Sequence, residues 1–196
     1  MRTAVLLARR RFIEAMLGVA MFPLLTQRTR AHQLGLVDPA IAIPRLTCVC
    51  SDGRSTTLLE LLNGKTTAVQ LMFTGCSAIC PMQGALYARI QSYLTDHAKR
   101  NIQLLSLSID PLSDDPKALS GWLKRFNARE GWIAAAPAMA ALTQMTTLFN
   151  GRAALPDTHS GQVYLVRRDA QLVWRTADLP APRHVVDLLI RLSANA

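Results

Sequence analysis

The stretch VQLMFTGCSAICPM, residues 69–82, decides the fold of this chain of 196 residues. It begins as a short apolar run of the kind that forms a buried strand, and it breaks at Thr74 and Gly75. Two cysteines follow, Cys76 and Cys80, and apolar residues then recur at helical spacing: Leu86, Ile90 and Leu94. The stretch therefore predicts a buried strand that ends in two cysteines at the start of a helix.

This position suits the chemistry of thiols. The free N–H groups and the dipole of a helix N-terminus stabilise negative charge, and only the thiolate attacks disulfides or binds soft metals. If Cys80 lies in the first turn, Cys76 lies one turn before it, and both sulfurs can reach one point. The alternative is that both cysteines are buried structural residues.

The spacing Cys76-x-x-x-Cys80 is compatible with a disulfide and with two thiolates on one metal ion. No histidine follows Cys80, so the motif for covalent haem attachment is absent. A structural zinc site would need four ligands. Two thiolates and one imidazole suit Cu(I), which is a soft ion and accepts low coordination numbers.

His159 can supply the imidazole. It lies in the loop LPDTHSG, residues 155–161, directly before an apolar stretch that predicts a strand over 162–166. In a sheet with parallel strands this loop can lie beside the strand end that carries Cys76. A histidine on a surface loop without any ligand role fits the spacing equally well.

Hydrophobic periodicity predicts an alternation of strands and helices along the rest of the chain. The predicted strands cover residues 44–50, 54–56, 66–73, 102–109, 131–135, 162–166 and 172–175, and the predicted helices cover 57–63, 80–99, 116–127, 137–149 and 182–192. Ser51-Asp52-Gly53 predicts an N-terminal hairpin. Such an order predicts an α/β fold with a central mixed sheet flanked by helices.

Residues 1–31 are typical of an export signal. Arg9-Arg10-x-Phe12-Ile13 resembles a twin-arginine signal, and the apolar segment 15–25 is too short for a comfortable membrane span. We expect a linker over 32–43 and a single domain over 44–196. The predicted location is the periplasm or the outer face of the cytoplasmic membrane, with membrane contact only through an uncleaved signal.

The net charge of +9 is not a nucleic-acid signature. Six arginines and one glutamate in residues 1–31 supply +5, so the rest of the chain carries +4. The rest has no basic run longer than a pair such as Arg167-Arg168. We therefore expect no nucleic-acid partner, and we interpret the mild basicity as useful for solubility or for an acidic protein partner.

Three segments resemble the Sco/SenC family of exported copper proteins, and they come in the order that the family shows. They are FTGCSAICP at 73–81, SIDPLSDDP at 108–116 and THSGQVYL at 158–165, and the similarity covers roughly residues 40–192. The resemblance implies a thioredoxin-like fold and copper ligation by Cys76, Cys80 and His159. It also implies a role in loading copper into the Cu(A) site of cytochrome oxidase, with the Cu(A) subunit or another copper protein as the partner.

Two further groups of residues have open roles. Asp110 and Asp114 can hold the cysteine or histidine loop by hydrogen bonds, or they can simply terminate a loop. Cys48 and Cys50 would face the same side of a strand, near the limit of disulfide reach. They can be core or spare thiols, a strained disulfide, or a second soft-metal pair.

Two functions of different classes remain. The first is a copper-binding assembly factor, which is not an enzyme in the strict sense and whose Cys76 and Cys80 form a reversible disulfide that must be reduced before Cu(I) binds. The second is a thiol–disulfide oxidoreductase that keeps partner cysteines reduced. His159 discriminates between them, because thiol exchange needs only an attacking and a resolving thiol. Peroxide reduction is a weaker third reading, since no arginine lies near Cys76 in the sequence.

Overall fold

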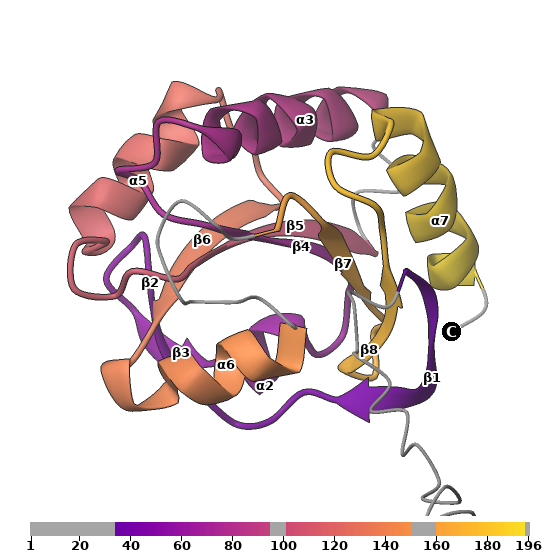
Figure 1. The fold of residues 1–196 in the computed structure, drawn as a ribbon, viewed down its shortest axis with the longest axis horizontal. Coiled ribbons are helices and arrows are strands. Elements are labelled where there is room, and N and C mark those ends of the chain that lie inside the picture. Colours follow the sequence, from indigo (N-terminus) through magenta and orange to yellow (C-terminus); the bar gives the residue numbers. More distant parts are fainter. Residues whose placement is uncertain (1–33, 95–100, 150–159, 195–196) are drawn as a thin grey trace, which may run out of the picture. The chain divides into compact units, whose positions relative to one another are not determined.

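The computed structural model describes residues 34–94, 101–149 and 160–194, which form one sheet with helices on both faces (Figure 1). The strands lie in the order β1-β8-β7-β4-β5-β6-β2-β3. They are β1 (Gly35–Ala42), β2 (Thr47–Cys50), β3 (Ser55–Thr57), β4 (Thr66–Met72), β5 (Ile102–Ser108), β6 (Trp132–Pro137), β7 (Val163–Val166) and β8 (Gln171–Arg175). β4, β5 and β6 are parallel to one another and the other neighbours are antiparallel, so the predicted mixed sheet is confirmed.

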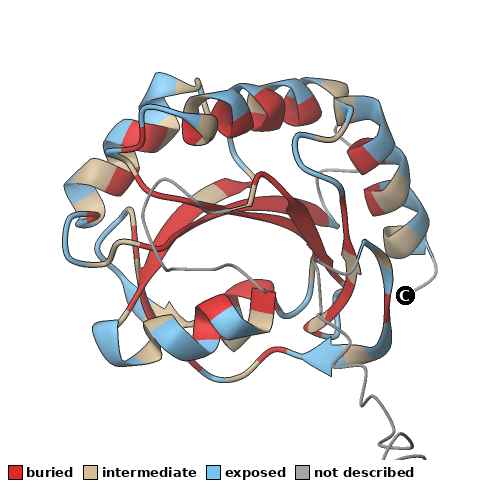
Figure 2. Cartoon of the chain, in the orientation of Figure 1, coloured by how far each residue is buried: buried red, intermediate tan, exposed pale blue. Residues whose placement is uncertain are grey.

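The helices divide between the two faces of this sheet. They are α2 (Leu58–Leu62), α3 (Ile79–Tyr93), α5 (Pro116–Arg125), α6 (Leu142–Phe149) and α7 (Pro182–Ala194), with a short 3-10 helix η1 (Met139–Ala141). Figure 1 shows α3, α5 and α7 over one face, and α2 and α6 over the other. All seven residues of β4 and all seven of β5 are buried, because both faces of these central strands are covered (Figure 2).

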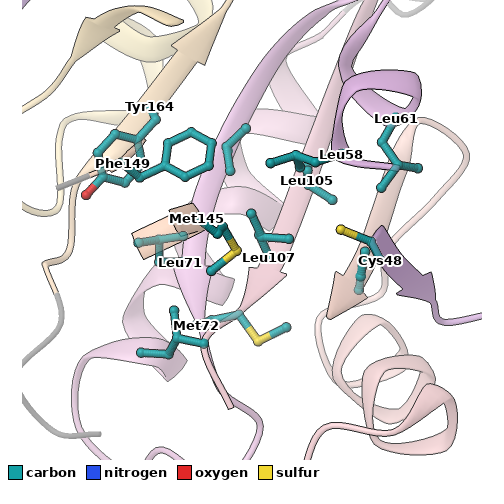
Figure 3. Packing of buried hydrophobic residues seen from close by; sticks show 14 of the residues in the cluster. Cys48, Leu58, Leu61, Leu71, Met72, Leu105, Leu107, Met145, Phe149 and Tyr164 are labelled. Atoms are coloured by element: carbon teal, nitrogen blue, oxygen red, sulfur yellow. The ribbon is translucent and has the colours of Figure 1, made fainter. Parts of the chain in front are cut away.

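Alternation along β4 assigns its side chains to two apolar clusters. Val69 and Leu71 belong to the cluster that contains residues of α2 and α6, including Leu58 and Phe149 (Figure 3). Ala68 belongs to the second cluster, which contains residues of α3 and α7. Both faces of β4 thus pack against apolar clusters, and neither face is exposed to solvent. This explains why the sequence shows an apolar run at this point.

Interactions between residues close in the sequence define several ends of helices and strands. β2 and β3 form the predicted hairpin. Thr57 and Glu60 form a capping box, in which the Glu60 N–H donates to Thr57 Oγ1 at 3.2 Å and the Thr57 N–H donates to Glu60 Oε2 at 3.1 Å. Asp115 caps α5 by accepting from the Ala118 N–H at 2.7 Å, and Pro116 occupies the first helical position.

The predicted linker is wrong where it covers residues 35–42. These residues form β1, an edge strand that pairs with β8 and places Gly35 opposite Arg175 and Ala42 opposite Gln171. The strand contains Pro39 and its register shifts between Leu36 and Ile41, so it lacks the regular alternation that signals a strand. Its stability comes from a partner about 130 residues away, which no local pattern reveals.

Two predicted helices are shorter than expected. α3 ends at Tyr93 rather than at Lys99, and residues 95–100 are outside the described part. Pro137 ends β6 instead of starting a helix, and α6 begins at Leu142 after η1. The predicted export signal at 1–31 also lies outside the described residues. No helix of the described part is long and apolar enough to cross a membrane.

Candidate metal centre

The two cysteines lie where the sequence places them, at the junction of β4 and α3. Cys76 is in the loop after β4, where its N–H donates to the Phe73 carbonyl at 3.2 Å. Cys80 is the second residue of α3. The residue exposures are 4% for Cys76 and 0% for Cys80, so the pair is buried, although Gly75, Ser77 and Ala78 beside it are exposed.

Burial changes the expected ionisation of Cys80. Burial raises the pKa of the Cys80 thiol far above its ordinary value, and a hydrogen bond that Cys80 shares with Cys76 raises this pKa further. A backbone hydrogen bond at Phe73 lowers it in part. At Cys80, desolvation therefore opposes the stabilisation of the thiolate that a helix N-terminus provides. None of the four cysteines forms a disulfide in the structure, and the shared hydrogen bond places the Cys76 and Cys80 sulfurs side by side.

Asp114 holds the start of the cysteine loop. Its exposure is 2%, and its carboxylate accepts hydrogen bonds from the Thr74 N–H at 3.1 Å, the Thr74 hydroxyl at 2.5 Å and the Ser108 hydroxyl at 2.6 Å. These bonds connect the turn after β5 to the loop after β4, 40 residues earlier in the chain. Of the two roles open to Asp114, the structure supports the one that fastens the cysteine loop.

Asp110 has a more local role. Its carboxylate accepts from the Ser113 N–H at 3.3 Å, and its carbonyl accepts from the Asp114 N–H at 2.9 Å. These contacts stay within the turn 110–114. Asp110 therefore shapes the turn that presents Asp114, and within the described residues none of its hydrogen bonds reaches the cysteine loop.

The segment that follows His159 packs against the first turn of α3. A Cβ atom built on Gly161 would lie 2.6 Å from Cδ1 of Ile79, the residue before Cys80. β7 is antiparallel to β4, with Val163 opposite Gln70, so residues 160–162 meet the end of β4 that leads to the cysteines. His159 itself lies outside the described residues.

A second set of contacts fixes this segment to the chain after β8. The Ser160 hydroxyl donates to Asp178 at 2.7 Å, and Gln162 Nε2 donates to the Thr176 carbonyl at 2.7 Å. The Leu179 N–H donates to the Gly161 carbonyl at 3.1 Å. Sequence reasoning missed Thr176 and Asp178, because they follow the last strand without any motif. The pairing of β7 with β8 brings them next to residues 160–162.

The donor set at the centre consists of two adjacent sulfurs. Within residues 34–94, 101–149 and 160–194 no three His, Cys, Asp or Glu side chains come together as metal ligands. Adjacent thiols are donors that a soft ion prefers.

Cys48 and Cys50 form a second pair of buried cysteines. Their exposures are 0% and 4%, and both belong to the same apolar cluster as Leu58 and Leu61 (Figure 3). Burial raises the pKa of Cys48 to about 12, and burial also raises that of Cys50. The structure thus favours the reading of this pair as core thiols. Trp122 and Trp132, which both donate to Ser106 Oγ, are core residues as well.

A buried strand that leads through two thiols into a helix, in a mixed sheet covered on both faces, defines a thioredoxin-like protein. The chain belongs to the SCO1/SenC family, whose model matches residues 45–193. A comparison with curated proteins found no significant match.

Solved structures of this family share the fold. Yeast Sco1 is 18% identical, with a TM-score of 0.68 over 82% of this chain and 98% of that chain. Bradyrhizobium japonicum ScoI with copper bound is 20% identical, with a TM-score of 0.62 over 78% and 99%. BsSco, described as a Sco-family cytochrome c oxidase assembly protein with a disulfide switch, is 21% identical, with a TM-score of 0.68 over 81% and 96%.

Proposed function

We propose that this protein is exported, binds copper through Cys76, Cys80 and His159, and assists copper insertion into the Cu(A) site of cytochrome c oxidase. Copper is then the cargo of a metallochaperone, and the protein is not an enzyme in this role. The bound copper of Bradyrhizobium japonicum ScoI and the assembly role described for BsSco support this proposal.

The contact between Gly161 and Ile79 is the observation that carries the proposal. Two residues of extended chain span at most about 7 Å, so the backbone of His159 stays within that distance of Gly161. Gly161 in turn touches the residue that precedes Cys80. The chain thus enters the described part beside the residue that precedes Cys80, and this supports His159, two residues earlier in the sequence, as the third ligand.

Copper content and Cu(I) affinity of purified residues 32–196, measured with and without reductant, test this function. We expect one Cu(I) per chain after reduction and no binding after oxidation, because a Cys76–Cys80 disulfide has no thiolate to donate. Mass spectrometry of the oxidised protein should find that bridge. Failure of the reduced protein to bind Cu(I) would overturn the proposal.

A thiol–disulfide oxidoreductase is the second candidate function. The adjacent sulfurs of Cys76 and Cys80 support it, as does the disulfide switch described for BsSco. In that case His159→Ala should leave disulfide exchange with a partner unchanged, because the reaction needs only an attacking and a resolving thiol. A Cu(I) affinity that is also unchanged in His159→Ala would favour this second function.

Cu(I) affinity should rise with pH. Because burial raises the pKa of Cys80, this thiol is protonated at neutral pH and must lose its proton when copper binds. Each proton released corresponds to roughly a tenfold gain in affinity per pH unit, so we expect a gain of at least about tenfold per unit between pH 6 and 8. A competition assay with a chelator of known protonation constants measures it. A flat profile would show that Cys80 is already a thiolate or is not a ligand.

Export by the twin-arginine route predicts a sharp response to a conservative change. Replacing Arg9 and Arg10 together by lysine keeps the charge of the signal, but we expect the protein to remain in the cytoplasm. Cell fractionation and immunoblotting measure the distribution, and an ordinary secretory protein serves as the control. Normal export of the double variant would contradict the twin-arginine route and leave export itself intact.

A further inference from the structure

Three exposed apolar side chains surround the position of the cysteines. Met82, Leu112 and Leu179 have exposures of 53%, 82% and 38%. We refer to these three residues as the apolar rim. The other large exposed apolar residues of the described part lie on β1, η1 and α7, or directly before β1. Three separate segments of the chain thus each contribute one such residue beside the same site.

Each rim residue is connected to the cysteine loop by its place in the chain or by hydrogen bonds and packing contacts. Met82 lies in the first turn of α3, two residues after Cys80. Leu112 lies in the turn 110–114, which Asp114 fastens to Thr74. The Leu179 N–H donates to the carbonyl of Gly161, which packs against the residue before Cys80.

Leu179 also has an unusual backbone. Its φ is +45°, in the left-handed region that a bulky L-residue rarely adopts. Glycine is the residue that occupies this region without strain. A partly exposed leucine held in this conformation gains little from core packing, and backbone strain of this kind concentrates at functional sites.

The burial of the two sulfurs means that a partner protein must contact the surface around them. Because Cys76 and Cys80 are almost fully buried, a protein that exchanges copper or a disulfide with them must come close against the surrounding surface. Asp110, Asp115 and Asp178 lie in the same segments, and none of them takes part in an ion pair within the described residues. The apolar rim is therefore accompanied by carboxylates that form no ion pair in the described part, although the whole chain is basic.

We propose that the apolar rim is the docking surface for the protein that accepts copper, an acceptor domain whose metal-binding thiols lie under an apolar face fringed by lysine or arginine. This inference rests on the proposed function and names the surface through which the transfer occurs. Apolar contacts at the centre of an interface supply most of the binding energy, and complementary charges at its edge speed the encounter.

Copper transfer to the purified apo Cu(A) domain of cytochrome c oxidase tests the surface. Leu112→Ser should lower the second-order rate constant of transfer by about tenfold, an effect of the size found for an interface hot spot. Its Cu(I) affinity should equal that of the wild-type protein, since Leu112 is outside the donor set. Ile190→Ser, which removes an exposed apolar side chain of α7, is the matched control and should transfer copper at the wild-type rate.

Leu179→Gly separates docking from folding. Glycine removes the apolar side chain and also relieves the left-handed strain, so we expect a variant at least as stable as the wild type that nevertheless transfers copper more slowly. A residue with a purely structural role would not combine these two effects. Transfer should also slow as salt increases, because salt screens the attraction between the carboxylates and the acceptor.

The outcomes distinguish the two proposals. If the wild-type protein loads the Cu(A) domain and both rim variants do so at the same rate, the docking surface is wrong and the proposed function stands. If the wild-type protein binds Cu(I) but neither binds nor loads the Cu(A) domain, the acceptor named here is wrong, and the docking inference falls with it. Equal slowing by Ile190→Ser would also overturn the assignment to the rim.

Discussion

Cys76→Ser, Cys80→Ser and His159→Ala are each expected to lower Cu(I) affinity by at least about 100-fold. Loss of a residue that merely supports a metal ligand costs roughly 10–100-fold, and loss of one ligand out of three should cost more. A hydroxyl or a methyl group cannot replace a thiolate or an imidazole for a soft ion. Competition with a Cu(I) chelator under reducing conditions measures the affinities.

Cys48→Ser is the matched control for the two serine variants. Cys48 is as buried as Cys80, with 0% exposure, so both substitutions place a hydroxyl in an apolar environment. We expect each to cost about 1–3 kcal/mol in the free energy of unfolding. Only Cys80→Ser should also lose copper. Wild-type Cu(I) affinity in His159→Ala would remove the three-ligand site that we propose and leave a site of two cysteines.

Asp114→Ala is expected to lower the free energy of unfolding by about 3 kcal/mol, the second large effect. The substitution removes a buried carboxylate and leaves the Thr74 N–H and the hydroxyls of Thr74 and Ser108 without their acceptor. Hydrogen bonds to a charged group contribute about 1.5–3 kcal/mol each, although such terms do not add fully. Urea unfolding at pH 7, followed by tryptophan fluorescence, measures the change.

Asp110→Ala is the control for Asp114→Ala, because it removes a carboxylate from the same turn. Asp110 is partly exposed, and among the described residues its side chain accepts only from the Ser113 N–H, so we expect a cost below about 1 kcal/mol. Asp114→Ala should also weaken Cu(I) binding, since it releases the start of the cysteine loop. Equal effects of the two substitutions would contradict the role that we assign to Asp114.

The sequence by itself determined the elements whose signals are local. The apolar run before Cys76 predicts β4, the turn residues 51–53 predict the hairpin, and Asp115-Pro116 predicts the start of α5, all as the structure has them. The three motif segments also predict the family correctly. These signals succeed because periodicity, capping and turn chemistry act between residues that are close in the chain.

Only the tertiary structure decided the properties that depend on distant parts of the chain. β1 exists because β8 pairs with it, so its irregular sequence appears as a linker when read alone. Asp114 differs from Asp110 because the fold brings Thr74 to its carboxylate. The ionisation of Cys80 follows from its burial and from Cys76 beside it, and these oppose the effect of the helix N-terminus that the sequence shows. Desolvation and long-range hydrogen bonds depend on which segments meet in space, and no local pattern encodes that.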